Sequence, residues 1–198
     1  MLIQSKRLET GIITDRRALL RGVGTVGLSA AAVAILGGCE SMAASSAATA
    51  ADVDILNVAL GLEHEAINAY QLGAESGLLE KPVLNVAVLF QGHHKAHRDA
   101  LISTIEKMGG KPVGEKAIGD YATALNAGSL KNQGDVLNLA ARLEKGAANA
   151  YLGVIPSFNE KGLAQVAGRL AADETMHWTA LASALGQNLP SNALTFGA

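Results

Sequence analysis

The chain has 198 residues, of which 49% are apolar but only 4% aromatic, a mixture typical of helices packed through small side chains. The formal net charge is −2, and about −5 once residues 1–38, with their five basic and two acidic side chains, are left out. An acidic domain without a basic stripe is a poor nucleic-acid binder, and a single cysteine excludes both an intrachain disulfide and a cysteine-based zinc cluster.

The N-terminal segment has the features of an export signal. Arg16-Arg17, followed closely by leucines, resembles a twin-arginine signal, and the stretch from Gly22 to Gly38 is uncharged and short for a membrane span. This stretch ends in Leu-Gly-Gly-Cys39, which resembles a bacterial lipobox, a motif whose cysteine is lipidated and becomes the new N-terminus. We therefore expect residues 1–38 to be a lipoprotein signal peptide that is handled by the twin-arginine export machinery.

Lipidation of Cys39 would anchor the mature protein to the membrane on the periplasmic side of the cell envelope. Two alternatives stay open at this point. One is a transmembrane anchor with an incidental cysteine, and the other is cleavage after Ala43 or Ala44, which would release a soluble periplasmic protein. Residues 39–51 are small and nearly uncharged, so we expect a flexible tether there and a folded domain that begins near Asp52.

Four long segments with helical periodicity follow the tether. Short connections join the first to the second and the third to the fourth, so each pair is expected to form an antiparallel helical hairpin. A long crossover, with a short helix expected around residues 120–126, separates the two hairpins. The prediction is an all-α four-helix bundle over residues 52–186 with a C-terminal tail of residues 187–198. Its expected helices span about residues 52–76, 82–108, 134–155 and 159–185.

The two hairpins also resemble each other in sequence. The segment from Asn57 to Tyr70 aligns without gaps on the segment from Asn138 to Tyr151, with identical residues at eight of fourteen positions. Further on, His97 to Ser103 matches His177 to Ser183 at four of seven positions. Shared Glu, Asn, Tyr and His at matching separations predict two copies of one hairpin, related by a pseudo-twofold axis.

Polar side chains interrupt the apolar stripe near the middle of every helix when the stripe is drawn with alternating steps of three and four residues. A buried carboxylate without a partner is costly, so three glutamates at one level need a shared compensation. A metal ion supplies it, because carboxylate and imidazole ligands suit iron, manganese or zinc. The predicted metal ligands are Glu63, His94, His97, Glu144, Glu174 and His177.

This pattern resembles the ferritin-like di-iron and di-manganese proteins, which use one glutamate from each of two helices and a Glu-x-x-His pair from each of the other two. Glu63 and Glu144 match the single glutamates, and Glu174-Thr-Met-His177 matches one complete pair. The second pair reads His94-Lys-Ala-His97, with histidine in the glutamate place. The resemblance covers roughly residues 52–185 and is strongest to exported bacterial ferritin-like domain proteins, a group that includes desiccation-related proteins.

The resemblance implies a bound metal ion, iron or manganese before zinc. Because a neutral imidazole does not bridge two metals, His94 leaves open two unlike metals, a single metal or none, and His93 could take its place. Tyr70 and Tyr151 are expected in the core, with their hydroxyls bonded to a ligand or to the opposite helix. His64 and Glu65 lie off the stripe and are expected at the surface. Asn68 and Asn149 also lie off the stripe and are given no role, and Trp178 is expected to pack between helices.

Three functions are compatible with these residues. The first is an exported metal-binding protein of the cell envelope, which the histidine in a glutamate place favours. The second is a di-iron or di-manganese oxidoreductase similar to ferroxidases or manganese catalases. The third is a degenerate bundle without metal that serves a structural or stress-related role. A homodimer is left open, whereas a closed ferritin shell does not suit a tethered N-terminus.

Overall fold

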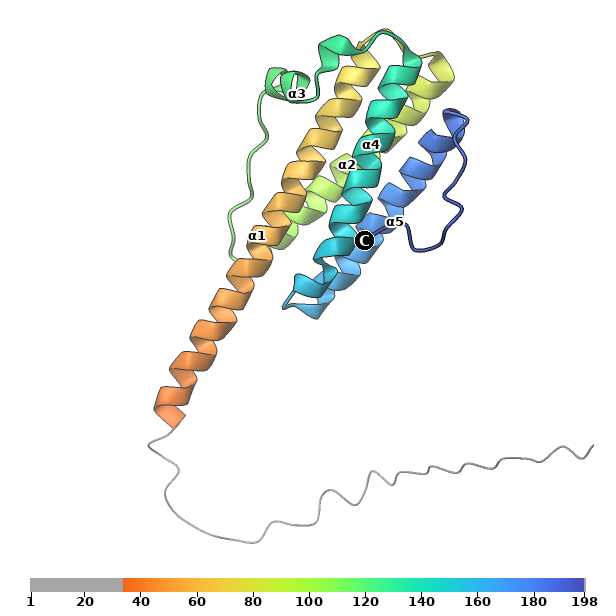
Figure 1. Cartoon of the computed structure of the whole chain (residues 1–198). Helices are drawn as coiled ribbons and strands as arrows, with labels where there is room; N and C mark the ends of the chain where they lie inside the picture. Colours follow the sequence, from red (N-terminus) through yellow and green to blue (C-terminus); the bar gives the residue numbers. More distant parts are fainter. Residues whose placement is uncertain (1–33, 198) are drawn as a thin grey trace, which may run out of the picture. The chain divides into compact units, whose positions relative to one another are not determined.

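The computed structural model describes residues 34–197, with side chains from residue 45 onward (Figure 1). This part of the chain is helical and contains no β-strand. Two short 3₁₀ turns, Ala127–Ser129 and Ile155–Ser157, accompany the α-helices. The α-helices are α1 (Ala34–Glu75), α2 (Lys81–Lys107), α3 (Ile118–Ala124), α4 (Gln133–Val154) and α5 (Lys161–Ala184).

The four long helices form the two predicted hairpins. In Figure 1, α1 and α2 run in opposite directions, the crossover returns along the bundle to its upper end, and α4 and α5 form the second antiparallel pair. Glycines with positive φ follow three of the helices, Gly77 after α1, Gly109 after α2 and Gly186 after α5. Glycine has no Cβ to clash in this left-handed conformation, so these positions end the helices as the sequence predicted. The all-α bundle is therefore confirmed.

The N-terminal part of α1 differs from the expected tether. The helix begins at Ala34, so residues 39–51 are helical instead of irregular. Alanine has the highest helix propensity of all residues, and this segment is rich in it. Asp52 is the first buried side chain among the residues whose side chains are described. Most of the predicted signal peptide, residues 1–33, lies outside the described residues, and no described helix is long and apolar enough to cross a membrane.

Asp52 ties the first hairpin to the second. Its carboxylate accepts hydrogen bonds from the backbone N–H groups of Asn159 and Glu160, each at 2.9 Å, and from the Asn159 amide at 3.1 Å. Burial by itself would raise the pKa of Asp52, but these three donors favour the charged form and lower the pKa on balance. The carboxylate therefore satisfies backbone donors just before α5 begins.

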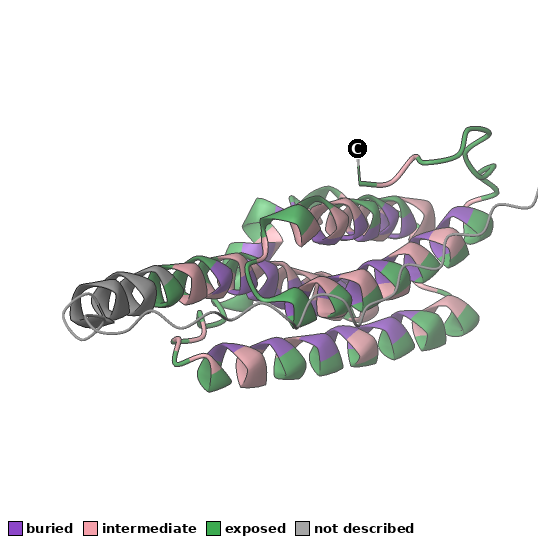
Figure 2. Ribbon diagram, turned by 90° about the horizontal axis from the view of Figure 1, so that it is seen from below, coloured by how far each residue is buried: buried purple, intermediate pink, exposed green. Residues whose placement is uncertain are grey.

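The bundle core consists of two apolar clusters with a polar layer between them. Each long helix turns a continuous buried stripe toward its neighbours, as Figure 2 shows. One cluster surrounds Leu60 and Ile105, and the other surrounds Phe90 and Leu181. The glutamates and histidines of the four helices lie between them. This arrangement places a charged layer at the depth where a bundle is normally filled with hydrocarbon.

Asparagines of the two repeats bind two different straps, which are the crossover between α2 and α4 and the C-terminal tail after α5. On α1, Asn57 accepts from the backbone N–H of Val113 at 2.7 Å and donates to the carbonyl of Lys111 at 3.1 Å, so it holds the crossover. On α4, Asn138 accepts from the Gln187 side chain at 3.3 Å, and Asn149 accepts from the backbone N–H of Gly197 at 2.8 Å, so both hold the C-terminal tail. Each hairpin is thus followed by a segment that folds back onto its own first helix.

Trp178 belongs to the tail contact. Its ring meets that of Phe196 edge-on, with centroids 5.2 Å apart, and the ammonium of Lys145 lies 5.9 Å from the indole centroid. The tryptophan therefore packs under the tail as well as against the bundle core, where it joins the Phe90 cluster.

Candidate metal centre

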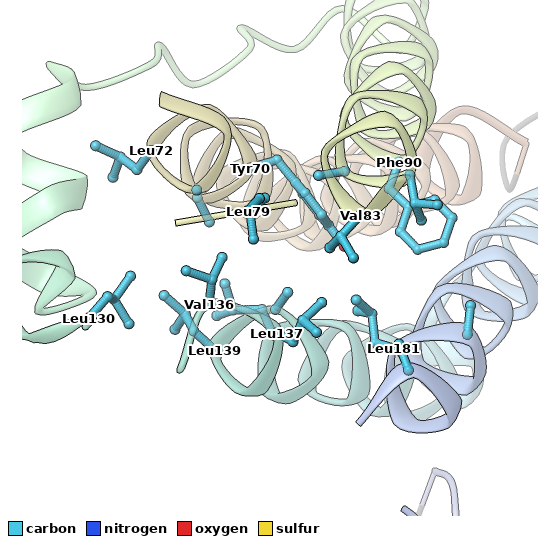
Figure 3. A pocket seen from close by; sticks show the side chains of 18 of the residues that line it. Tyr70, Leu72, Leu79, Val83, Phe90, Leu130, Val136, Leu137, Leu139 and Leu181 are labelled. Carbon is cyan, nitrogen blue, oxygen red and sulfur yellow. The ribbon is translucent and has the colours of Figure 1, made fainter. Parts of the chain in front are cut away.

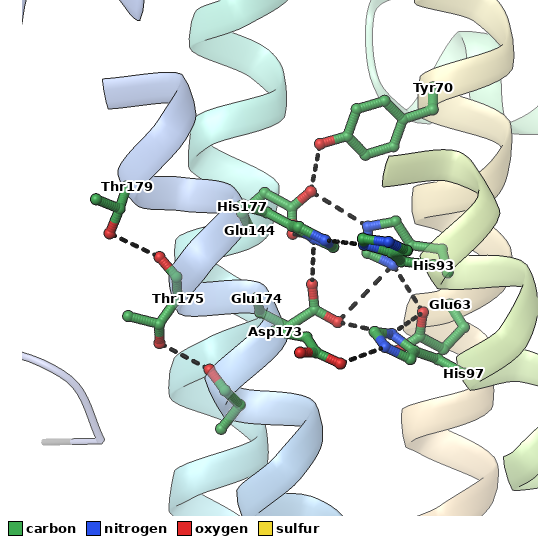
Figure 4. Close-up of polar contacts among 12 residues, drawn as sticks. Glu63, Tyr70, His93, His97, Glu144, Asp173, Glu174, Thr175, His177 and Thr179 are labelled. Atoms are coloured by element: carbon green, nitrogen blue, oxygen red, sulfur yellow. Dashed lines mark hydrogen bonds and ion pairs between the residues drawn. The ribbon is translucent and has the colours of Figure 1, made fainter. Parts of the chain in front are cut away.

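The structure brings all six predicted ligand residues into one buried layer (Figure 4). Each long helix contributes, and no member of the set exposes more than 8% of its surface. The stripe periodicity positions them, because residues three or seven apart on a helix face the same neighbours. The members are Glu63 on α1, His94 and His97 on α2, Glu144 on α4, and Glu174 and His177 on α5.

One group of four consists of Glu63, His94, His97 and Glu174, whose ligand atoms all lie within 4.8 Å of one another. Nδ1 of His94 lies 2.8 Å from Oε2 of Glu63, and Nδ1 of His97 lies 3.2 Å from Oε1 of Glu174. Nδ1 of His97 is also 3.7 Å from Oε2 of Glu63. Two carboxylates and two imidazoles at these separations can surround a single cation.

A second group of four consists of His94, Glu144, Glu174 and His177, again with ligand atoms within 4.8 Å of one another. Nδ1 of His177 lies 3.2 Å from Oε2 of Glu174 and 3.4 Å from Oε2 of Glu144. Nε2 of His94 lies 3.2 Å from Oε1 of Glu144. The donor set repeats that of the first group, so the layer offers two neighbouring positions for a cation.

His94 and Glu174 belong to both groups. The two oxygens of Glu174 face different histidines, Oε1 toward His97 and Oε2 toward His177. The two ring nitrogens of His94 likewise face different glutamates, Nδ1 toward Glu63 and Nε2 toward Glu144. The repeat aligns position 94 with position 174, so the two shared residues are equivalent in the two hairpins.

His93, the alternative to His94 in the sequence, lies outside both groups. Its Nδ1 is 2.9 Å from Nε2 of His177, on the side of that ring away from the glutamates. The exposed carboxylate of Asp173 has the same relation to His97, with Oδ2 3.1 Å from Nε2. Such outer partners fix the orientation of a ligand imidazole and leave the opposite nitrogen for a metal. Both histidines therefore present Nδ1 to the centre.

The two predicted tyrosines contact the glutamates from above and below the layer. The hydroxyl of Tyr70 donates to Oε1 of Glu144, and the hydroxyl of Tyr151 donates to Oε1 of Glu63. Burial and the neighbouring carboxylates raise the pKa of both phenols, which keeps them neutral hydrogen-bond donors. The second oxygen of each glutamate stays turned toward the histidines.

The charges within the layer depend on one another. Burial alone would lower the pKa of His94, but Glu144 and Glu63 favour its charged form and raise the pKa to about 10. Glu174 and Glu63 raise the pKa of His97 to about 10 in the same way. Burial alone would raise the pKa of Glu144, yet His177 and His94 hold it well below the usual range. Without a metal, protonated histidines therefore compensate the glutamates.

Hydrogen bonding leaves part of this layer unsatisfied, and this tests whether the residues fit a cation. Buried polar atoms nearly always have a hydrogen-bond partner. Three buried atoms of the layer form no hydrogen bond of good geometry, namely Nδ1 of His97, Oε2 of Glu144 and Oε1 of Glu174. Nδ1 of His97 and Oε1 of Glu174 face each other at 3.2 Å, and Oε2 of Glu144 faces Nδ1 of His177 at 3.4 Å. Each of these atoms has a lone pair when its group is deprotonated, so the donor set fits a transition-metal ion.

The comparisons with known proteins concern the family and the fold. The sequence model of the ferritin-like domain matches residues 51–187. The chain belongs to the ferritin-like family. A crystal structure of a conserved hypothetical protein from Mycobacterium tuberculosis is similar in fold, with a TM-score of 0.60 and 21% identity. That match covers 74% of this chain and 99% of the other. No curated protein matches this ferritin-like chain.

His64 is the clearest error of the sequence interpretation. It was expected at the surface, but it exposes only 5% because the crossover lies over it. Its Nε2 donates to the carbonyl of Val113 at 3.2 Å, and one turn further on Asn68 donates to Glu115 at 2.5 Å. The shared asparagines of the repeat were the available signal for these strap contacts. Asp173 was also missed, although it directly precedes the Glu174 pair and shares its helix turn.

Proposed function

We propose that this ferritin-like protein binds iron or manganese in the Glu/His layer, with one ion in each of the two groups. The observation that carries the proposal is the pair of buried groups, each with four carboxylate and imidazole ligand atoms within 4.8 Å of one another. Buried glutamates this close together are costly without a compensating charge, and a bound cation would supply it. Sharing of Glu174, whose two oxygens face different histidines, supports two ions over one, and a neutral His94 would bind only one of them.

The residues have separate roles in this proposal. Glu63 and Glu144 would each bind one ion through the oxygen that its tyrosine leaves free. His97 and His177 would bind through Nδ1, with Asp173 and His93 holding the rings from behind. Protonated histidines would release their protons on metal binding, because only a neutral imidazole has a free lone pair. Bound iron or manganese would supply redox chemistry toward oxygen or peroxide.

Elemental analysis tests the proposal directly. The full chain is purified without chelator, beside Glu174→Gln and a control, Glu65→Gln, which changes a half-exposed glutamate on α1. We expect two equivalents of iron or manganese in the native protein and in the control. Glu174→Gln should lose both, because both groups contain this residue. Native protein that stays free of metal after reconstitution would reject metal binding and leave a hydrogen-bonded structural bundle.

An oxidoreductase is the second candidate function. It is favoured by the shared carboxylate of Glu174, which would hold two ions next to each other, and by the phenols that contact the layer. The test is the addition of ferrous iron to metal-free protein in air and under nitrogen. An oxygen-dependent absorbance change would support catalysis, and binding without any such change would limit the protein to holding metal.

Export and anchoring form a separate proposal, supported by the sequence of residues 16–39. Arg16-Arg17 would direct the chain to the twin-arginine machinery. Lipidated Cys39 would then anchor the exported protein to a membrane, on the periplasmic side of the cell envelope. Because that export route moves folded proteins, the metal could be inserted before export. Labelling with radioactive palmitate tests the anchor: Cys39→Ala should lose the label and leave the membrane fraction, while Arg16→Lys/Arg17→Lys should stop export.

A further inference from the structure

A cavity of about 250 Å³ lies in the bundle end where α1 ends and α4 begins (Figure 3). All four long helices line it, and the end of the crossover, with Leu125 and Leu130, covers part of it. The lining is almost entirely hydrocarbon, because its residues are alanines, leucines, valines, a glycine, a proline, Phe90 and Tyr70. Water has no hydrogen-bond partners on such walls, so the space favours an apolar occupant.

The lining of the cavity extends along two of the helices. Its lining runs along α2 from Pro82 to Phe90 and along α4 from Val136 to Leu143. At a rise of about 1.5 Å per residue, these stretches give a length of roughly 11 Å. In Figure 3 the side chains follow this direction, from Leu130 at one end to Phe90 at the other. A cavity lined over this length admits an extended alkyl chain.

The inner end of the cavity borders the candidate metal centre. Tyr70 lines the cavity with its ring and donates its hydroxyl to Glu144. Phe90 also lines it, and its ring stacks on that of His177 with centroids 4.1 Å apart and an interplanar angle of 25°. Two of the proposed ligand residues thus lie directly behind the cavity wall, so an occupant would end one side chain away from the metal layer.

The opposite end of the bundle, around the repeat-equivalent tyrosine, can be compared with the end that contains the cavity. There Tyr151, the equivalent of Tyr70, packs with Leu163 and Leu170 in a filled apolar cluster. The repeat aligns Leu163 with Val83 and Val154 with Gly73, so two cavity-lining positions carry the smaller residue. At these two positions the side chains that line the cavity near Tyr70 are smaller than their equivalents, whereas Phe90, the equivalent of Leu170, is larger.

We propose that this cavity binds the alkyl chain of an aliphatic molecule, with the end of the chain against Tyr70 and Phe90. A dry cavity of about 150 Å³ already holds benzene, so the volume here admits a larger apolar ligand. The near absence of polar atoms in the lining means that any head group stays at the mouth, near Pro82 and the half-exposed Val86. Binding of the chain needs no metal, whereas any reaction of the chain would rest on the metal function proposed above.

Titration with 1-octanol, followed by calorimetry and by thermal unfolding, tests the proposal on the full chain in metal-free and metal-loaded form. We expect saturable binding and a raised melting temperature in both forms. Ala140→Leu, which fills the cavity from α4, should weaken binding at least about tenfold. Ala100→Leu makes the same change at an exposed position of α2 and should bind like the native chain.

Val83→Leu is a second filling variant, and it introduces the residue that the repeat already tolerates as Leu163. Weakened binding in either cooperatively folded variant supports the proposal. Equal binding by native and filled proteins would show nonspecific association and overturn it, as would the absence of saturable binding. Tight binding of benzene without binding of 1-octanol would overturn the alkyl assignment. Octanol binding in a protein that takes up no metal would keep this proposal and reject only the metal function.

Discussion

The hydroxyl of Tyr70 on α1 donates its hydrogen bond to Glu144 on α4, a helix of the other hairpin. The relation is reciprocal, because Tyr151 on α4 donates to Glu63 on α1. Each repeat therefore supplies the phenol that orients the glutamate of its partner repeat. The two hairpins are joined at the candidate centre by exchanged hydrogen bonds, and the position of each glutamate depends on both.

Replacing Tyr70 with phenylalanine removes one of these bonds while keeping the ring that lines the cavity. Partners that orient a metal ligand typically contribute 10–100-fold to metal affinity, so we expect Tyr70→Phe to weaken metal binding by about that factor. A competition titration with a chromogenic chelator measures it. Tyr121→Phe is the matched control, since Tyr121 is buried in α3 and its hydroxyl bonds only the Lys116 backbone N–H there. Equal affinity in both variants would show that the phenol has no orienting role.

Restoring a glutamate at position 94 should strengthen the binding of a second ion. The residue would then match its repeat equivalent Glu174 and complete a four-carboxylate set. We expect His94→Glu to bind two manganese ions more tightly, and to unfold more readily without metal because a fourth buried carboxylate lacks a cation. Manganese stoichiometry and denaturant unfolding give both quantities. Ala96→Glu, which adds the same charge at an exposed position of α2, is the control. A similar gain in that variant would mean that the added charge attracts cations without binding them in the centre.

In metal-free protein, the free energy of unfolding should fall as the pH rises into the alkaline range. The pKa of His94 and of His97 is about 10 in the fold, above the usual 6.5, so their stabilising effect is complete below about pH 6.5. It is lost as pH rises toward about 10, because the folded protein then gives up the protons it held more tightly. Chelator-treated protein should lose more than about 1.4 kcal/mol of unfolding free energy between pH 6.5 and 9.5. A flat urea-unfolding profile over that range would contradict the charged network.

Asp52→Ala should destabilise the bundle by about 1–2 kcal/mol, because the backbone donors of Asn159 and Glu160 lose their acceptor at the start of α5. Asp54→Ala, two residues further along α1 at an exposed position, is expected to change little. Because the hydrogen bonds lower the pKa of Asp52, its contribution is present above the usual value of 3.8 and disappears as pH falls below it. Guanidinium unfolding at neutral and acidic pH separates the two variants.

The sequence was sufficient to predict the bundle and the composition of the buried layer, since both follow from periodicity. The apolar stripe fixes which face of each helix is inside, and Glu63, His94, Glu144 and Glu174 lie on that stripe at one level. The repeat added the pairing of the hairpins. Shared spacing was thus enough to place residues that are more than eighty positions apart in the chain.

The strap contacts could not be predicted in the same way. His64 lies off the stripe, and its burial depends on the path of the crossover, which has no periodicity to reveal it. The outer partners Asp173 and His93 depend on side-chain directions across two helices, which spacing along one helix does not give. The helical residues 39–51 were read as a tether because they lack apolar bulk, although their alanines favour a helix with or without a core.

The histidine at position 94 also affects the charge balance of the layer. With two divalent ions bound, four positive charges would meet only three carboxylates, whereas a glutamate at this position would bring the sum to zero. An excess positive charge at this depth is strongly unfavourable, so a small anion from solvent would be drawn in to balance it. Hydroxide is the smallest such anion, and azide or fluoride would compete for the same place. The substitution that removes a carboxylate would thus prepare the centre to accept an outside anion.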